Sequence, residues 1–107
     1  MIPTTNGTPT PNRILEVGHA FRASKTLLTA VELGVFTALA VGPLDAEALR
    51  KRVDIHERGV RDFLDALVAL GMLARDERGH YANCAEADLY LDRNKQTYVG
   101  GVLERLS

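Results

Sequence analysis

The stretch 59–73 constrains the fold most, because in it an amphipathic helix runs directly into a segment of strand character. Apolar residues recur every three or four positions from Val60 to Val68, which is typical of a helix with one core-facing stripe. Gly71 has no Cβ and can take the left-handed conformation that ends a helix. The polar turn 76–79 then separates two short strand-like segments. A helix followed by such a ribbon predicts the second half of a winged helix, which in different proteins reads DNA or joins subunits.

Two helices are expected ahead of this stretch. Asn12 can cap a helix over 13–22, and Ser24 can cap another over 25–33. The second helix is apolar almost all round and ends at a glycine, and such a helix is normally buried on more than one side. In so small a domain one side is expected to face another subunit or domain. The alternative is a central helix wrapped by its own chain.

A third helix completes the motif. Asp45 can cap it over 46–53, and a tight turn at 54–57 leads into the helix that begins at Val60. Two helices joined by such a turn and followed by a hairpin form a helix-turn-helix with a wing. The expected fold class is therefore mainly α: a winged-helix-like helical domain with one small β-hairpin.

The two ends of the chain differ from its middle. Residues 1–12 are rich in proline and threonine, which predicts a flexible N-terminal tail. Residues 13–95 are expected to form the winged-helix-like domain. Residues 96–107 carry apolar side chains at helical spacing without a closing signal, so they are expected to start a helix that leads to a further domain or is covered by a partner.

Composition restricts the function. The formal net charge of −1 argues mildly against a dedicated nucleic-acid module. Cys84 is the only cysteine, so the chain has no internal disulfide and no basis for a thiol zinc site. The N-terminus does not resemble a secretory signal, and the most apolar segment, 27–41, is too short to span a bilayer. A cytoplasmic location without a membrane partner is expected.

No catalytic, cofactor-binding or metal-binding residue is predicted in this chain. The three histidines, His19, His56 and His80, lie on separate elements, and no spacing brings two of them to one carboxylate. Ser24 is explained as a helix cap. The pair at 100–101 lacks the spacing of a glycine-rich nucleotide loop.

Nucleic acid is an unlikely partner for the outer face of the helix at 60. Arg58 and Arg61 lie there beside Asp62 and Asp65, and the arginines of the wing are likewise offset by acidic neighbours. Carboxylates on a groove-facing side repel the phosphates that dominate affinity for DNA. A DNA-binding winged-helix transcription regulator therefore stays the alternative, and a self-sufficient enzyme has little support.

Three segments taken together, 31–39, 42–49 and 61–73, resemble the N-terminal dimerisation domain of small-molecule O-methyltransferases, such as enzymes of plant phenolic and bacterial polyketide pathways. The resemblance extends over residues 13–103 and includes 98–101. It implies a module that swaps helices with a second copy to form a homodimer. In the family, catalysis belongs to a separate C-terminal Rossmann-like domain that binds S-adenosylmethionine, and this chain lacks the glycine-rich motif of that domain.

The resemblance implies a homodimerisation module, the N-terminal part of a methyltransferase that acts on a small molecule, with secondary metabolism as its setting. S-adenosylmethionine and the small-molecule substrate are expected only with the catalytic domain. Phe21 and Leu28 lie in the region that, in the family, can reach the partner's substrate pocket. The dimer interface is expected to comprise apolar residues of the first two helices and the C-terminal helix: Ile14, Val17, Phe21, Leu27, Leu28, Val31, Val99, Val102 and Leu103.

Overall fold

The computed structural model describes residues 8–105. The helices of this part are α1 (Asn12–Leu33), α2 (Val35–Leu39), α3 (Ala46–Val53), α4 (Val60–Ala69), α5 (Ala85–Tyr90) and α6 (Gly100–Glu104), and a 3₁₀ turn, η1 (Glu57–Gly59), precedes α4. The strands are β1 (Leu44–Asp45), β2 (Leu73–Arg75) and β3 (His80–Asn83). The expected mainly α fold with a small wing is confirmed.

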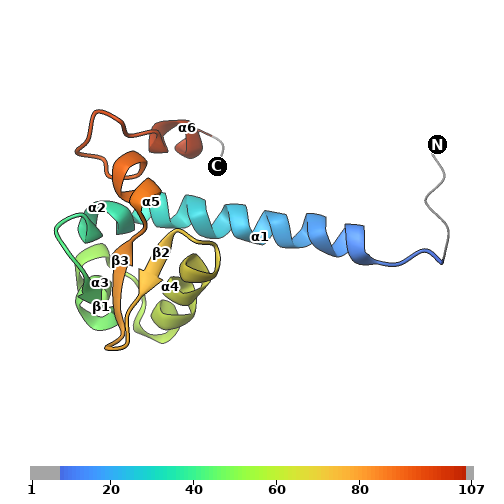
Figure 1. Cartoon of the computed structure of the whole chain (residues 1–107), viewed down its shortest axis with the longest axis horizontal. Helices are drawn as coiled ribbons and strands as arrows, with labels where there is room; N and C mark the ends of the chain where they lie inside the picture. The colour runs from blue at the N-terminus through green and yellow to red at the C-terminus, as the bar shows by residue number, and fades with distance from the viewer. Residues whose placement is uncertain (1–7, 106–107) are drawn as a thin grey trace.

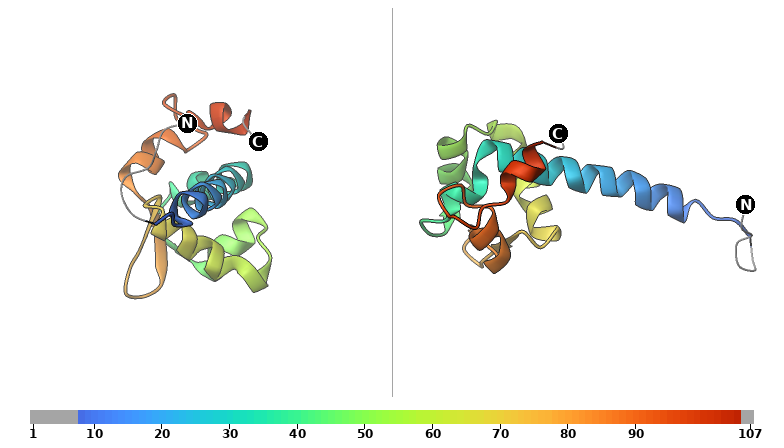
Figure 2. Two further views of the ribbon diagram at one scale, coloured as in Figure 1. Left: turned by 90° about the vertical axis from the view of Figure 1, so that its right-hand side faces the viewer. Right: turned by 90° about the horizontal axis from the view of Figure 1, so that it is seen from above.

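The elements pack around one end of α1 (Figure 1). α2, α3, α4 and the sheet gather at its C-terminal end, and α5 and α6 lie on the other side of that end. Seen from above, the N-terminal half of α1 extends beyond the other described elements (Figure 2, right). The described domain is accordingly elongated, with extents of 51 × 31 × 23 Å.

The wing is a three-stranded antiparallel sheet in the order β1-β3-β2. β2 and β3 form the predicted hairpin, with Leu73 opposite Asn83. The third strand was not predicted: Leu44 of β1 pairs with Tyr81 of β3. Asp45 ends β1 and also caps α3 as predicted, since its Oδ1 accepts a hydrogen bond from the Ala48 amide at 2.8 Å. Because one residue both ends the strand and starts the helix, it joins the wing to the helix-turn-helix.

The core lies between the C-terminal end of α1, the short helices and β3. Its largest fully buried side chains are Tyr81, Phe36, Leu49, Leu64, Leu67 and Val35. The apolar stripe predicted for α4 is confirmed at three of its positions, because Val60, Leu64 and Leu67 are all buried. Gly71 follows α4 with φ of +79°, the left-handed value expected of a helix-ending glycine.

The predicted break in the first helical region is wrong. One continuous helix of 22 residues replaces the two helices expected over 13–22 and 25–33, and Ser24 lies inside it. Serine lowers helix stability only slightly and has no steric reason to end a helix, so the helix continues through Ser24. Asn12 is the first helical residue rather than the cap, which is Pro11. Most of the predicted N-terminal tail, and Ser107, lie outside the described residues.

Tyr81 links the wing to α4 from inside the fold. Its hydroxyl donates a hydrogen bond of 2.6 Å to Asp65 Oδ1, and Arg75 lies over its ring at 5.7 Å from the centroid. Arg75 in turn contacts the Asp65 carboxylate at 3.3 Å. Burial, together with the hydrogen bond to the Asp65 carboxylate, raises the pKa of Tyr81 to about 12. The three side chains fix the angle of the hairpin on the helix.

This pKa predicts how stability depends on alkaline pH. In the unfolded chain the pKa of Tyr81 is near 10.0, so between pH 10 and about 12 the unfolded state loses this proton while the folded state keeps it. The stabilising contribution is therefore complete below pH 10 and is lost as pH rises toward 12. Urea titrations should show a steeper decline in the free energy of unfolding for the wild type than for Tyr81→Phe, and parallel curves would contradict the assignment.

Candidate dimerisation surface

The N-terminal half of α1 exposes apolar side chains that have no cover within residues 8–105. Ile14, Val17 and Phe21 are 76%, 72% and 70% exposed, and Leu15 is half exposed. A helix of 22 residues is about 33 Å long, and every residue from Asn12 to Arg22 is exposed. Isolated helical turns with few packing contacts are marginal in water. This half of α1 therefore needs a surface that the described chain does not supply.

The two apolar faces of α1 point in different directions. Ile14, Val17 and Phe21 follow one another at spacings of three and four, so they share one face, which Leu28 continues. Ala30 is buried in the domain's own core. It lies nine residues after Phe21, about two and a half turns, and so faces the opposite side of the helix. One face of α1 therefore serves this domain, while the other remains open along the projecting half.

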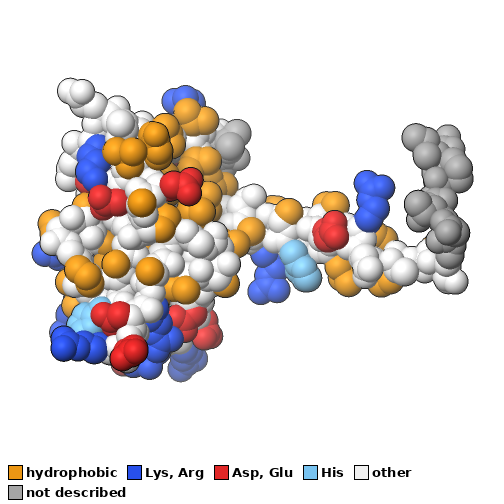
Figure 3. All heavy atoms as spheres, in the orientation of Figure 1, with side chains coloured by type: hydrophobic (Ala, Val, Ile, Leu, Met, Phe, Trp, Pro, Cys, Tyr) orange, Lys and Arg blue, Asp and Glu red, His pale blue; other side chains and the backbone are white. Residues whose placement is uncertain are grey.

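Exposed apolar residues also gather over α5 and α6. Val99 and Val102 are 45% and 54% exposed, and Leu89 and Tyr90 are similarly open. Figure 3 shows apolar side chains grouped over the upper part of the domain, where these elements lie, and further apolar side chains along α1. α6 packs beside α1, so the two exposed regions lie on neighbouring elements. We define the candidate dimerisation surface as Ile14, Leu15, Val17, Phe21, Leu89, Tyr90, Val99 and Val102.

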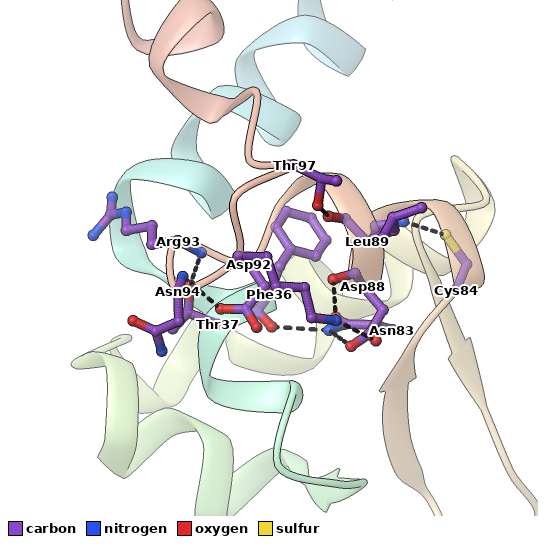
Figure 4. Close-up of polar contacts among 12 residues, drawn as sticks. Phe36, Thr37, Asn83, Cys84, Asp88, Leu89, Asp92, Arg93, Asn94 and Thr97 are labelled. Atoms are coloured by element: carbon purple, nitrogen blue, oxygen red, sulfur yellow. Dashed lines mark hydrogen bonds and ion pairs between the residues drawn. The ribbon is translucent and has the colours of Figure 1, made fainter.

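Polar contacts hold α5 and the following loop against α2 (Figure 4). Asn83 Nδ2 donates to the Phe36 carbonyl at 2.8 Å and to Asp88 at 3.1 Å. Lys95 Nζ donates to Asp88 Oδ2 at 2.8 Å, and the hydrogen bonds from Lys95 and Asn83 hold the pKa of Asp88 below its ordinary value. The Thr97 hydroxyl donates to the Leu89 carbonyl. These contacts give the C-terminal part of the candidate surface a fixed position.

Arg93 joins this loop to the end of α1. Its Nη2 donates to the carbonyls of Val31 at 2.7 Å and Glu32 at 3.1 Å, two of the last carbonyls of the helix. A cation here adds a donor for carbonyls at the end of the helix and lies at the negative end of the helix dipole. The same nitrogen contacts Glu104 of α6 at 3.2 Å, and the Arg93 amide donates to the Thr37 hydroxyl. One residue thus connects α1, α2 and α6.

Removing this side chain is expected to loosen α6. Arg93→Ala leaves the end of α1 without its side-chain donor and frees the Glu104 contact, so we expect about 1–2 kcal/mol lower free energy of unfolding. Amide hydrogen exchange should speed up in α6 and in the last turn of α1 but not in α4. Arg52→Ala, which removes an exposed arginine of α3, is the control. Unchanged exchange in α6 would show that Arg93 does not anchor it.

The structure divides the predicted interface residues into two groups. Ile14, Val17, Phe21, Val99 and Val102 are exposed, while Leu27 and Leu28 are half-buried. Val31 is only 2% exposed and packs in the domain's own core, so we leave it out of the candidate dimerisation surface. Leu103 packs partly on that core as well. Sequence periodicity could not separate these cases, because both faces of α1 are apolar.

Some contributors were missed. Leu15 lies next to the predicted stripe, and Leu89 and Tyr90 lie on α5 and at its end, in a segment for which no interface residue was predicted. Arg93 carried no sequence signal, since its partners are backbone carbonyls some sixty residues away. The Cys84 thiol accepts a hydrogen bond from the Ala87 amide and caps α5.

The remaining residues considered for metal or nucleic-acid binding lie apart from the candidate dimerisation surface. His56 Nδ1 accepts a hydrogen bond from the Arg58 amide and caps η1. Within residues 8–105 no group of three or more His, Cys, Asp or Glu side chains could hold a metal ion. Arg58, Arg61 and Asp62 are exposed on the outer side of η1 and α4. No helix in the described part of the chain is long and apolar enough to cross a membrane.

Comparison with known proteins decides the family. The model of the O-methyltransferase dimerisation domain matches residues 15–93, which is most of the chain. This chain belongs to the O-methyltransferase dimerisation domain family. The match covers α1 to α5 and ends at Arg93, the residue that anchors the segment leading out of the domain.

Two bacterial relatives of this dimerisation domain come from Streptomyces species. The tetracenomycin polyketide synthesis 8-O-methyl transferase TcmO of Streptomyces glaucescens is 53% identical over 91 residues, which are 85% of this chain and 27% of the relative. The N,N-dimethyltransferase OxyT of Streptomyces rimosus is 39% identical over 90 residues, 84% of this chain and 26% of the relative.

The fold is also found in a solved human enzyme. Human N-acetylserotonin methyltransferase, determined in complex with S-adenosylmethionine, superposes with a TM-score of 0.82 at 30% identity, covering 96% of this chain and 32% of that one. The dimerisation domain described here thus spans about a quarter to a third of the length of these proteins.

Proposed function

We propose that this domain pairs with a second copy of itself through the candidate dimerisation surface, and that the pair forms the dimer core of a methyltransferase. The observation that carries the proposal is the projecting half of α1, with Ile14, Val17 and Phe21 at least 70% exposed on one face. Family membership supplies the kind of partner, since the family is a dimerisation domain. An obligate dimer of this kind is expected to bury about 2,000 Å² or more in total.

Helix exchange accounts for the direction of α1. The N-terminal half of α1 points away from its own domain (Figure 1). A second copy would cover this half by packing its own helices against it. α6 and α5 of one copy offer the exposed Val99, Val102 and Tyr90 for the projecting helix of the other. Swapping identical elements between protomers is an established route to a dimer. Phe21 and Leu28 are proposed, on the family resemblance, to reach the partner's substrate pocket.

The whole protein is proposed to be an S-adenosylmethionine-dependent enzyme of secondary metabolism that methylates a small molecule. The described residues themselves do not fit the cofactor. Rossmann-type binding needs a parallel strand followed by a glycine-rich turn and a helix, whereas this sheet is antiparallel and its strands are two to four residues long. No step of methyl transfer is therefore assigned to residues of this chain. A cytoplasmic location stays a prediction from sequence.

The acceptor atom is not determined by this domain. TcmO is named an O-methyl transferase and OxyT an N,N-dimethyltransferase, yet both share this dimerisation domain at 39% identity or more. The domain thus fits a scaffold that is common to different methyl acceptors. We propose an oxygen acceptor because the relative with the higher identity of the two acts on oxygen.

Sedimentation of the 107-residue chain tests the pairing. The expected species has twice the mass of one chain, and its proportion falls on dilution. Helix exchange is tested on a mixture of isotopically labelled and unlabelled protein, in which contacts between α1 of one copy and α5 or α6 of the other are expected in isotope-filtered NMR spectra. A monomer at all concentrations would overturn the proposal, while a dimer without those contacts would overturn the exchange alone.

A further inference from the structure

A hollow lined by charged residues lies on the opposite side of the domain from α5 and α6. This hollow of about 350 Å³ opens between the wing, the start of α3 and α4. Three arginines line it, Arg61 from α4, Arg75 from β2 and Arg78 from the wing turn, with Tyr81 among the other lining residues. Figure 3 shows charged side chains of both signs gathered around the wing. The hollow shares no residue with the candidate dimerisation surface.

The arginines differ in what already holds them. Arg75 is fixed by the Asp65 carboxylate and by the ring of Tyr81 beneath it. Within residues 8–105 no ion pair or hydrogen bond holds the side chain of Arg61 or of Arg78. The backbone beneath Arg78 is rigid nevertheless, because Asp76 Oδ1 accepts hydrogen bonds from the Arg78 and His80 amides, each at 2.9 Å. The side chains of Arg61 and Arg78 thus extend from fixed backbone positions, and neither has an ion-pair partner within the described residues.

The carboxylates at the hollow are mostly engaged elsewhere. Asp45 caps α3 through the Ala48 amide. Glu47 contacts Arg50 at 2.6 Å, and the hydrogen bond from Arg50 lowers the pKa of Glu47. Asp45 and Glu77 have no ion pair within the described residues, and Glu77 accepts no side-chain hydrogen bond there either. The lining thus has three arginines and three carboxylates, and Arg61 and Arg78 are the two cations among them that no side-chain contact holds within the described residues.

The geometry points to a binding site for a phosphate group in this hollow, held by Arg61 and Arg78 with Arg75 as a third cation. Guanidinium groups bind phosphate oxygens through paired, charge-assisted hydrogen bonds, and several converging on one hollow bind more tightly than one. A neighbouring hollow of about 300 Å³ shares Arg61 and continues toward Arg58, so the organic part of a phosphate ester has room beside the phosphate. The site is independent of the pairing proposed above.

NMR titration of the 107-residue chain at constant ionic strength tests this site with inorganic phosphate and phenyl phosphate as probes. We expect saturable shifts of the wing-turn amides, and roughly ten-fold weaker binding for Arg61→Ala and for Arg78→Ala. Arg52→Ala, which removes the same charge outside the hollow, should bind as the wild type does. Tighter binding of phenyl phosphate identifies an ester as the ligand, and equal binding identifies free phosphate.

Three outcomes would overturn the site. The first is amide chemical shifts that change linearly with phosphate concentration, without saturation, and by the same amount in Arg61→Ala. The second is an equal loss in Arg52→Ala, which would indicate general charge attraction. The third is binding of a short DNA duplex, lost in Arg58→Ala, in the absence of saturable phosphate binding, which would indicate a nucleic-acid surface. Sedimentation of the same variants separates this result from the pairing, because an unchanged dimer mass is expected throughout.

Discussion

Phe21→Asp is expected to convert the dimer into a monomer or an aggregate. Phe21 is 70% exposed in one copy, and we expect it to be buried in the pair. Burying a phenylalanine side chain contributes about 1.5–3 kcal/mol, and a twofold interface loses this twice. The dissociation constant should therefore rise roughly 100- to 10,000-fold, before the cost of burying a carboxylate is added. Sedimentation equilibrium over a range of concentrations measures the change.

Glu16→Lys is the matched control for Phe21→Asp. Glu16 is exposed on the same half of α1, five residues before Phe21, and so lies well away from the apolar face. The substitution changes the charge by two units, and a dimer of nearly unchanged affinity is expected. If both variants dissociate alike, charge on the helix rather than its apolar face controls the pairing. If Phe21→Asp sediments as the wild type does, the face is not an interface.

Phe36→Ala is expected to cause the largest loss of stability within the domain itself. Phe36 is completely buried in α2, and its carbonyl accepts the hydrogen bond from Asn83. Truncating a buried phenylalanine removes apolar burial and leaves a cavity, at a cost of about 3–5 kcal/mol. Urea unfolding should be followed at one fixed protein concentration, because the stability of a dimer depends on concentration.

Phe63→Ala tests whether position rather than residue type decides this loss. Phe63 lies on α4 and is only partly buried against the same core. The cavity left there opens to solvent, so the expected loss is clearly smaller than for Phe36→Ala. Equal losses in the two variants would mean that α2 does not form the centre of the core.

Burial was predicted best from the sequence for elements that have one face in water and the other in the core. α4 has a single apolar stripe, and its burial and its ending at Gly71 follow from spacing and from one left-handed glycine. α1 is apolar on two faces, so the same reasoning could not decide which face belongs to this domain. For that reason the sequence predicted Val31 for the interface, whereas in the single chain it is buried in the domain's own core.

Contacts between distant backbone groups could not be predicted at all. β1 is two residues long and exists because Leu44 and Asp45 pair with β3. A strand so short has no periodicity to detect. The role of Arg93 likewise depends on helix carbonyls that any sequence would supply, so only the three-dimensional arrangement reveals it.

Because α1 is continuous through Ser24, the helix fixes the direction of its exposed apolar face relative to the core of the domain. The C-terminal half is locked in the domain's core at Ala30, and the N-terminal half carries Phe21 on the opposite side of the same rigid rod. Each residue inserted or deleted between them would turn the open face by about 100°. In the proposed dimer, the number of residues between Phe21 and Ala30 therefore sets the direction in which one copy faces the other, and a flexible break at Ser24 would remove this constraint.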